Sequence, residues 1–175
     1  MKTILFLRHA KSDWGDPAQA DFDRPLTQRG LEDVPRMGEV LHLFQCVPDI
    51  ILSSPALRAK QTAQLAARAC GYGGPIRWED SFYGGGSQDL ILVLQRLPDT
   101  LERPLLVGHN PTLEESVSTL LVQRQEGCQE DAMIRMPTAG LVCLDMDITT
   151  WADLGPGKGM LQWFLIPKLV RAIQQ

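Results

Sequence analysis

Histidines and arginines stand at the ends of three apolar runs in this 175-residue chain. Arg8 and His9 end the segment ILFLRHA, and His109 follows the run LLVG. Arg58 lies in ILSSPALRAKQTA, just inside an expected helix start. In an open α/β sheet the carboxyl ends of the strands converge on one crevice, where ligands bind. If these runs are strands of such a sheet, two imidazole rings and two guanidinium groups meet around one ligand.

Phosphoryl transfer is the chemistry that these side chains suit. A neutral imidazole such as His9 can attack phosphorus and hold the phosphoryl group covalently, which divides one hard displacement into two easier ones. The transferred group carries negative charge on three oxygens, so catalysis consists mostly of positioning and electrostatic stabilisation. Arg8 and Arg58 would supply planar, permanently charged forks that bind phosphate oxygens bidentately. His109 would donate to a phosphoryl oxygen as an imidazolium.

Each of these signals is weak by itself. An Arg-His pair is common by chance, and GHNP is also typical of a capped turn that contains a structurally bonded histidine. For either histidine alone, a structural role is the more frequent case. The combination favours catalysis because all three segments leave strands in the order that a doubly wound fold requires. The remaining histidine, His42, lies in an expected helix without a partner motif, and we predict a structural role for it.

Length and composition indicate one domain that spans residues 1–175. A chain of this size buries roughly 70% of its unfolded surface on folding. Hydrophobic residues make up 44% and charged residues 22% of the chain, which is ordinary for a soluble globular protein. The formal net charge of −4 argues against general binding of nucleic acid, whose phosphate backbone calls for a basic face. A local positive pocket is compatible with this charge.

The cysteines and the N-terminal segment bear on the cellular compartment. The four cysteines are widely spaced, without a CxxC pair or zinc-like spacing, so we predict reduced thiols in a cytoplasmic protein. They are Cys46, Cys70, Cys128 and Cys143. The opening run MKTILFL is too short for a signal peptide and is followed by charge. No segment approaches the roughly 20 apolar residues that span a bilayer, so we expect no membrane partner.

Alternating strands and helices predict an α/β fold with a largely parallel sheet and helices on both faces. The expected strands are Thr3–Leu7, Asp49–Leu52, Ile76–Trp78, Leu105–Val107, Leu141–Met146 and Leu161–Ile166. The first expected helix begins after Thr27, and the second begins after Ser54 and ends near Cys70. Two further helices are expected at Asp89–Leu97 and from Thr112 to about Gln123, and a last helix at the end of the chain. The segments 11–25 and 81–87 are predicted loops, the second one mobile because it contains three consecutive glycines.

The first helix has a clear start signal and one conflicting residue. Thr27 is a suitable N-cap, and Pro35 predicts either a kink or a later helix start because proline lacks a backbone N–H. The apolar stripe of this helix would consist of Leu31, Val34, Leu41 and Phe44.

Two later helices share a cap followed by proline. Ser54 would cap a helix whose first residue is Pro55, and Asn110 with Pro111 repeats this arrangement. Gly71 would end the earlier of the two helices in the left-handed conformation. Both helix N-termini would add positive dipole ends to the crevice that holds the histidines.

Five segments together resemble the histidine phosphatase superfamily, specifically its small SixA-type branch of phosphohistidine phosphatases. They are RHAKSDW, DFDRPLTQRG, SSPALRAKQTA, VGHNP and MPTAGL, and in combination they are highly specific. The resemblance implies a three-layer α/β/α sandwich with a mostly parallel central sheet, and a phosphatase that needs neither metal nor cofactor. By motif, His9 corresponds to the phosphorylated nucleophile. Arg8, Arg58 and His109 correspond to the rest of the phosphate pocket.

The chain departs from the family pattern at one position and leaves one role open. The usual RHG motif is RHA here, with Ala10, a small residue that is common in the SixA-like branch. Many relatives use a glutamate between the second arginine and the second histidine to protonate an alcohol leaving group. Glu79 and Asp80 are the candidates for this general acid, and Asp80 is the better positional match. A solvated acidic turn accounts for either residue equally well. Arg24 of the DRPLT segment would orient the substrate loop, and Trp14 would line the mouth of the site.

The open question of the acid bears on the substrate. An alkoxide is a poor leaving group, so a phosphate monoester needs a positioned acid, whereas the imidazole of phosphohistidine leaves as a neutral ring. Little inserted material separates the motifs, which favours an open site that admits a protein side chain. We therefore predict hydrolysis of protein phosphohistidine through a covalent intermediate on His9, with release of inorganic phosphate. The alternatives are a phosphatase of small phosphate monoesters and a module that binds phosphate without turnover.

Overall fold

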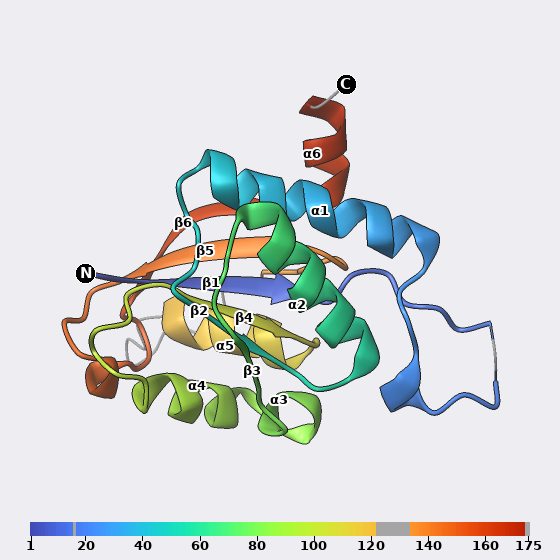
Figure 1. Ribbon diagram of the computed structural model, residues 1–175. Coiled ribbons are helices and arrows are strands. Elements are labelled where there is room, and N and C mark those ends of the chain that lie inside the picture. The colour runs from blue at the N-terminus through green and yellow to red at the C-terminus, as the bar shows by residue number, and fades with distance from the viewer. Residues whose placement is uncertain (16, 122–133, 174–175) are drawn as a thin grey trace.

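The computed structural model describes residues 1–15, 17–121 and 134–173. At its centre is a six-stranded mixed sheet in the order β3-β2-β4-β1-β5-β6 (Figure 1). All six predicted strands are present, and their ends differ from the prediction by no more than two residues. The strands are β1 (Lys2–Arg8), β2 (Ile50–Ser53), β3 (Ile76–Trp78), β4 (Pro104–Gly108), β5 (Leu141–Met146) and β6 (Gly159–Leu165).

The strand directions place three strand ends side by side. Strands β1 to β4 run parallel to one another. Strand β5 runs antiparallel to β1, and β6 runs antiparallel to β5. β4 lies between β1 and β2, with Arg8 opposite Gly108 and Ser53 opposite Val107. Residues that follow these three strands therefore share one edge of the sheet. The predicted, mostly parallel sheet is confirmed.

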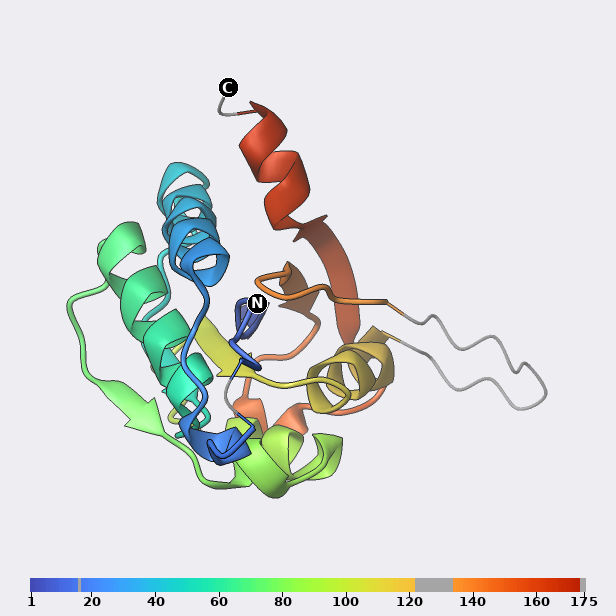
Figure 2. The same cartoon turned by 90° about the vertical axis from the view of Figure 1, so that its right-hand side faces the viewer.

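Helices cover both faces of the sheet, as predicted. The helices α1, α2 and α6 lie over one face, and α3, α4 and α5 lie over the other (Figure 2). Their bounds are α1 (Gln28–Leu43), α2 (Leu57–Cys70), α3 (Ser81–Gly84), α4 (Ser87–Gln95), α5 (Thr112–Leu121) and α6 (Pro167–Ile173). Two short 3-10 turns are η1 (Asp21–Asp23) and η2 (Trp151–Asp153). The fold is thus a three-layer α/β/α sandwich.

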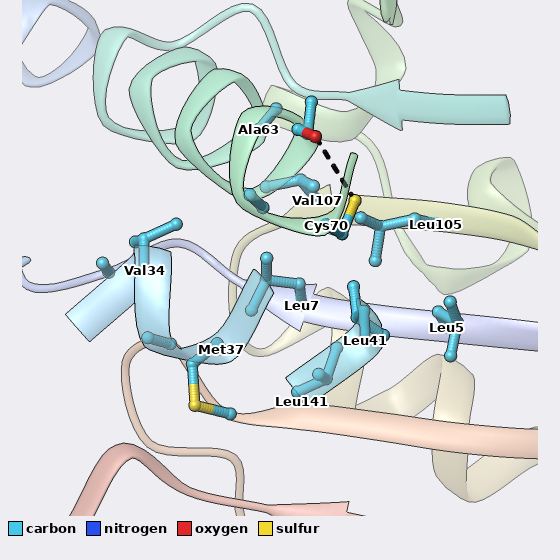
Figure 3. Packing of buried hydrophobic residues seen from close by; sticks show 14 of the residues in the cluster. Leu5, Leu7, Val34, Met37, Leu41, Ala63, Cys70, Leu105, Val107 and Leu141 are labelled. Atoms are coloured by element: carbon cyan, nitrogen blue, oxygen red, sulfur yellow. Dashed lines mark hydrogen bonds between the residues drawn. The ribbon is translucent and has the colours of Figure 1, made fainter. Parts of the chain in front are cut away.

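The core consists of two apolar layers, one on each side of the sheet. Side chains of β1 alternate between them: Leu5 and Leu7 pack under α1 and α2 (Figure 3), and Ile4 and Phe6 face α4 and α5. All four are at most 1% exposed. A strand that is covered on both faces must be apolar at every position, which explains the unbroken run ILFL. Burying each such side chain contributes roughly 1.5–3 kcal/mol, so the strand that carries the first histidine is firmly anchored.

Helix α1 follows the prediction at its start and departs from it along its stripe. The Thr27 hydroxyl accepts a hydrogen bond from the backbone N–H of Gly30 at 3.2 Å, which confirms the N-cap. The helix begins directly at Gln28 and contains Pro35, so a later start is wrong. Val34 and Leu41 are buried, but Leu31 is 39% exposed and Phe44 is 50% exposed. Leu31 lies at the border of the buried face and Phe44 lies just beyond the last helical residue.

The two predicted pairs of cap and proline do not form caps. Helix α2 begins after Ala56 rather than at Pro55, and the Ser54 side chain turns toward His109 instead. The Asn110 side-chain oxygen accepts no hydrogen bond from any described residue, so it does not cap α5. Gly71 ends α2 with a φ of 81°, which confirms the left-handed stop. The predicted end of α5 near residue 123 lies outside the described residues.

The segment predicted as a mobile loop, 81–87, contains a helix. Helix α3 covers Ser81–Gly84, and its buried Phe82 anchors it to the core. Asp89 accepts a hydrogen bond from the backbone N–H of Gly86 at 2.9 Å, so α4 begins at Ser87, two residues before the prediction. The glycines connect two helices and do not form a long loop.

Three of the four cysteines and all helices named above lie within the described residues. Cys46, Cys70 and Cys143 are free thiols, and Cys128 lies outside the described residues. Within the described part of the chain, each helix is too short or too polar to cross a bilayer.

Candidate active site

The strand ends bring four of the five predicted site residues together. Arg8 is the last residue of β1 and His9 follows it, His109 follows β4, and Arg58 lies in the first turn of α2. The ring centroids of His9 and His109 are 5.0 Å apart. All four side chains line one cavity of about 260 Å³. The other lining residues are Lys11, Ser12, Trp14, Arg24, Asn110 and Thr138.

His9 is held in one tautomer by its neighbour in the chain. Its ring Nδ1 lies 2.8 Å from the carbonyl oxygen of Ala10. A carbonyl oxygen only accepts hydrogen bonds, so Nδ1 carries the proton and donates it. In the neutral ring Nε2 then keeps its lone pair. Nε2 is therefore the nitrogen that is available to attack phosphorus.

The surroundings of His9 keep its ring neutral. Burial is the main cause that lowers the pKa of His9 from 6.5 to about 3. The hydrogen bond to Ala10 opposes this shift, and electrostatic interactions with His109, Arg58 and Arg8 add to it. Removal from water and nearby like charge both disfavour the protonated ring. Because only an unprotonated imidazole can act as a nucleophile, His9 is in its reactive form at neutral pH.

His109 is oriented by Ser54. The Ser54 hydroxyl oxygen accepts a hydrogen bond from the backbone N–H of Ala56 at 3.3 Å and lies 2.8 Å from Nε2 of His109. In the tautomer in which the hydroxyl donates its proton to Nε2, the proton of the neutral ring lies on Nδ1. Nδ1 is buried and has no hydrogen-bond partner among the described residues. It is therefore a donor that a bound anion can use.

His109 is neutral when no anion is bound. Burial, with a further contribution from the charge of Arg58, lowers the pKa of His109 from 6.5 to about 4. The reason is that the cavity is shielded from water and already contains guanidinium groups. The imidazolium was predicted for the ring that donates to a bound phosphoryl group, and for that state it stays a prediction. A neutral ring protonated on Nδ1 can still donate to a phosphoryl oxygen, so the hydrogen bond does not depend on the charge.

Several arginine nitrogens around the cavity lack partners. Nη1 of Arg8 donates to the carbonyl oxygen of Met136 at 2.7 Å, but its Nε is buried and unpaired. Three more buried nitrogens have no hydrogen-bond partner among the described residues: Nε of Arg58, and Nε and Nη1 of Arg24. A buried donor without a partner costs roughly 1–3 kcal/mol, and more when it is charged. Unpaired donors from three arginines at one cavity indicate a site for an anion with several acceptor oxygens.

Arg24 is a cavity residue that the sequence did not assign to the phosphate pocket. Its side chain is only 8% exposed, and its guanidinium lies 3.4 Å from the ring centroid of Trp14. A β-bridge between Ser12 and Leu26 joins the two ends of the intervening segment and returns Arg24 to the cavity. The DRPLT motif was a signal for this residue, but only the folded segment shows where the side chain lies.

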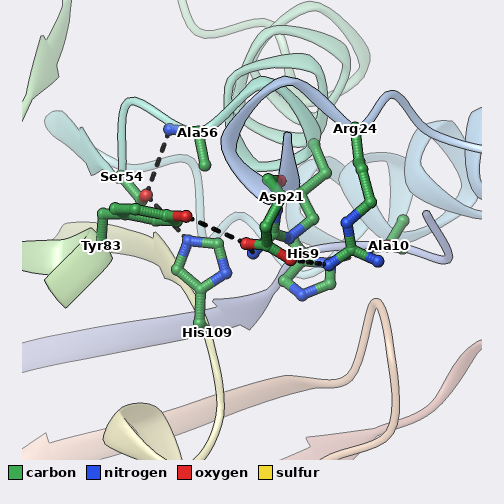
Figure 4. Close-up of polar contacts among 9 residues, drawn as sticks. His9, Ala10, Asp21, Arg24, Ser54, Ala56, Tyr83 and His109 are labelled. Atoms are coloured by element: carbon green, nitrogen blue, oxygen red, sulfur yellow. Dashed lines mark hydrogen bonds and ion pairs between the residues drawn. The ribbon is translucent and has the colours of Figure 1, made fainter. Parts of the chain in front are cut away.

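A carboxylate that the sequence analysis did not select also lies against these arginines. Asp21 forms an ion pair with Arg24, and its Oδ2 lies 3.0 Å from Nη2 of Arg58 and 3.0 Å from the hydroxyl of Tyr83 (Figure 4). Burial alone would raise the pKa of Asp21, but the hydrogen bonds from Tyr83 and Arg58 and the charges of Arg58 and Arg24 lower it. Asp21 is therefore ionised at neutral pH. Tyr83 belongs to α3, the helix that was predicted as a loop.

Comparison with known proteins agrees with this geometry. The profile of the histidine phosphatase superfamily (branch 1) matches residues 4–82. An uncharacterized protein of Mycobacterium tuberculosis (strain ATCC 25618 / H37Rv) is 32% identical over 168 residues, which cover 93% of this chain and all of that protein. The chain belongs to the histidine phosphatase superfamily.

Solved structures with the same fold include two proteins named SixA. The crystal structure of a candidate phosphohistidine phosphatase SixA from Agrobacterium tumefaciens has a TM-score of 0.79 and 30% identity, and the match covers 95% of this chain and 98% of that one. The protein histidine phosphatase SixA complexed with tungstate has a TM-score of 0.79 at 20% identity, with coverage of 96% and 99%. The second likeness shows the fold alone.

The MPTAGL segment of this member of the superfamily holds the backbone at Arg8 and His9. The backbone N–H of Ala139 lies 3.1 Å from the carbonyl oxygen of Arg8 and 3.2 Å from that of His9. The backbone N–H of Arg8 donates in turn to the carbonyl oxygen of Gly140 at 3.1 Å. Ala139 has a φ of 57°, so the chain turns sharply there and places Thr138 on the cavity. The motif thus holds the strand end on the side away from β4.

The two candidates for the general acid lie apart from the histidine phosphatase cavity. Asp80 immediately precedes α3, and its side chain is exposed and does not line the cavity. Glu79 forms an ion pair with Arg77 and is also absent from the lining. Both stand close in sequence to Tyr83, which does contact the site residues Asp21 and His109. A general-acid role for Asp80 stays a prediction.

Proposed function

We propose that this protein is a metal-independent phosphohistidine phosphatase, with Nε2 of His9 as the covalent nucleophile. One observation carries the proposal: a neutral imidazole, fixed in one tautomer, lines a cavity whose unpaired donors belong to three arginines and His109. This arrangement supports attack on a phosphoryl group because it combines an available lone pair with several donors for the phosphoryl oxygens.

The reaction consists of two displacements at phosphorus. In the first, the Nε2 lone pair of His9 forms a bond to phosphorus, and the bond from phosphorus to the leaving group breaks with its electrons on the leaving atom. The guanidinium groups and Nδ1–H of His109 hold the phosphoryl oxygens. In the second, water attacks phosphorus, the P–N bond returns its electrons to Nε2, and dihydrogen phosphate leaves. His9 is then neutral again with its proton still on Nδ1, so the cycle closes without a net proton change on the ring.

The size of the cavity supports a phosphoryl group on a larger partner rather than an enclosed small molecule. Its volume of about 260 Å³ lies below the roughly 300–1,000 Å³ of pockets that enclose whole small ligands. Trp14, which is 73% exposed, stands beside it against Arg24. The likeness to the Agrobacterium tumefaciens SixA supports the same substrate class. Arginines supply the positive charge around the cavity, which supports a mechanism without a metal.

The test is turnover of a phosphohistidine peptide and of p-nitrophenyl phosphate, each with and without a chelator. We expect release of inorganic phosphate from the peptide, no effect of the chelator, and loss of at least about 10³-fold in kcat for His9→Ala, because the nucleophile is removed. Rapid quenching in alkaline denaturant should trap a phosphorylated wild-type protein, and later acid treatment should release the label, as a phosphohistidine requires.

A matched control is His42→Ala, which removes the histidine that lies in α1 near the carbonyl oxygen of Cys70. This variant should keep wild-type turnover. Hydrolysis of small monoesters with no action on the peptide would favour the metabolite phosphatase. Phosphate binding without turnover of either substrate would favour a binding module and would end the proposal.

A further inference from the structure

Asp21 is a half-exposed carboxylate that is bound to two arginines of the cavity. His9 lines the cavity and is only 9% exposed, whereas the Asp21 side chain is 49% exposed. Figure 4 shows the Asp21 carboxylate between Tyr83 and Arg24. In a phosphoryl transfer the attacking and leaving atoms are roughly in line with phosphorus. A leaving group opposite the buried His9 must therefore point toward the solvent side, where Asp21 lies.

The arginines connect Asp21 to the cavity. Nη2 of Arg58 holds Oδ2 of Asp21 at 3.0 Å, while Nε of the same guanidinium is unpaired. Arg24 likewise pairs with Asp21 through Nη2 and leaves Nε and Nη1 unpaired. An anion bound to the unpaired nitrogens would share both guanidinium groups with Asp21. One guanidinium group then separates the carboxylate from the phosphoryl oxygens.

We propose that Asp21 is a catalytic residue that selects N-phosphoryl substrates by accepting a hydrogen bond from the distal ring N–H of phosphohistidine. This inference rests on the proposed function and assigns the substrate class to one residue. When Nε2 of His9 attacks, the P–N bond of the substrate breaks and its electrons return to the ring nitrogen. The substrate ring leaves as neutral imidazole because its distal nitrogen already carries a proton. Asp21 keeps that proton in place and takes none itself.

The same carboxylate disfavours phosphate esters. The pKa of Asp21 is lowered by Tyr83 and Arg58 despite partial burial, so the group has no proton to give an alkoxide at neutral pH. An ester oxygen offers no N–H for the carboxylate to bind. A negative charge beside the phosphoryl site also repels acidic metabolites that carry phosphate. Asp21 therefore favours the phosphoramidate and gives no help to the ester.

The test compares Asp21→Asn with wild type on two substrates. Asparagine keeps the size of the side chain and removes the charge. We expect kcat/KM for a phosphohistidine peptide to fall by about 10- to 100-fold, as for loss of a hydrogen bond to a charged group. Hydrolysis of p-nitrophenyl phosphate, whose leaving group needs neither a proton nor an N–H contact, should stay within about 3-fold of wild type. Inorganic phosphate should bind more tightly to the variant because a negative neighbour is gone.

Two further variants complete the experiment. Asp23→Asn changes the other carboxylate of η1, which forms no ion pair within the described residues, and should match wild type on both substrates. Tyr83→Phe removes the hydroxyl that orients Asp21 and should lower kcat/KM for the peptide selectively, by about 3- to 10-fold, even if Asp21→Asn does not fold.

The outcomes separate this inference from the proposed function. Equal losses on both substrates, or weaker phosphate binding by Asp21→Asn, would mean that Asp21 only holds the arginines in place, and would overturn its assignment as a selective residue. A wild-type protein that hydrolyses p-nitrophenyl phosphate but not the peptide would overturn the proposed function, and this assignment with it. A selective loss for the peptide supports both.

Discussion

At the scale of single residues, groups outside the cavity lining decide what the lining residues do. The carbonyl oxygen of Ala10 fixes the proton of His9 on Nδ1, and the hydroxyl of Ser54, when it donates to Nε2, leaves that of His109 on Nδ1. One ring is thereby prepared to attack and the other to donate, although both are neutral. Identical side chains thus acquire opposite roles from a single hydrogen bond each.

Removing the Ser54 hydroxyl should weaken the donor role of His109. In Ser54→Ala the ring of His109 loses the contact that holds its orientation and tautomer, and we expect kcat to fall by about 5- to 10-fold with little change in KM. Steady-state kinetics with p-nitrophenyl phosphate measure this. Ser53→Ala is the control, because Ser53 is also fully buried but donates to the carbonyl oxygen of Ser54 and not to His109. Equal losses in both variants would show that the effect is one of packing.

At the scale of elements, the start of α1 supports the segment that follows the nucleophile. A Cβ atom on Gly30 would lie 2.4 Å from the carbonyl oxygen of Lys11 and 3.3 Å from its backbone nitrogen. The same carbonyl accepts a hydrogen bond from the backbone N–H of Thr27 at 2.9 Å. The glycine of the motif DFDRPLTQRG is thus a consequence of close contact between α1 and the backbone beside Ala10.

Gly30→Ala should therefore reduce activity although it improves helix propensity. The propensity gain of roughly 1 kcal/mol is smaller than the cost of a backbone clash, so the chain at Lys11 must shift and carry the Ala10 carbonyl with it. A displacement of the nucleophile near 1 Å can cost about 100-fold, and we expect kcat to fall by about 10- to 100-fold on every substrate. Gly73→Ala is the control, since a Cβ there would meet nothing within 4 Å. Unchanged kinetics for Gly30→Ala would show that the loop adapts without moving His9.

The sequence was sufficient to predict those elements whose position depends on a local pattern of residues. An apolar run that ends in charge located β1, and Gly71 located the end of α2, because both signals act within a few residues. The contacts that complete the site join distant residues instead. Ser54 reaches His109 across 55 positions, Arg58 reaches Asp21 across 37, and Tyr83 reaches Asp21 across 62. Spacing in the sequence contains no information on such pairs, which is why Asp21 and Tyr83 were not predicted and Ser54 was predicted as a cap.

At the scale of the whole molecule, the buried histidines make the folded state sensitive to acid. His9 and His109 titrate near pH 3 and 4 in the folded protein and near 6.5 when unfolded. Between these values the unfolded chain binds more protons, so the free energy of unfolding rises with pH. The contribution is complete above about pH 6.5 and is lost as the pH falls toward the folded pKa values. A cavity that keeps its nucleophile neutral therefore reduces stability in mild acid.

Replacing the nucleophile should make the protein more resistant to acid. One histidine that gains a full proton on unfolding contributes a slope of roughly 1.4 kcal/mol per pH unit to the free energy of unfolding. His9→Gln should flatten the measured dependence by up to about that amount between pH 6 and 4. Urea unfolding at half-unit intervals from pH 7.5 to 4.5 measures both slopes in the same buffers. An unchanged slope would mean that His9 takes up no proton on unfolding, and its ring would then be charged, not nucleophilic, in the folded protein below pH 6.5.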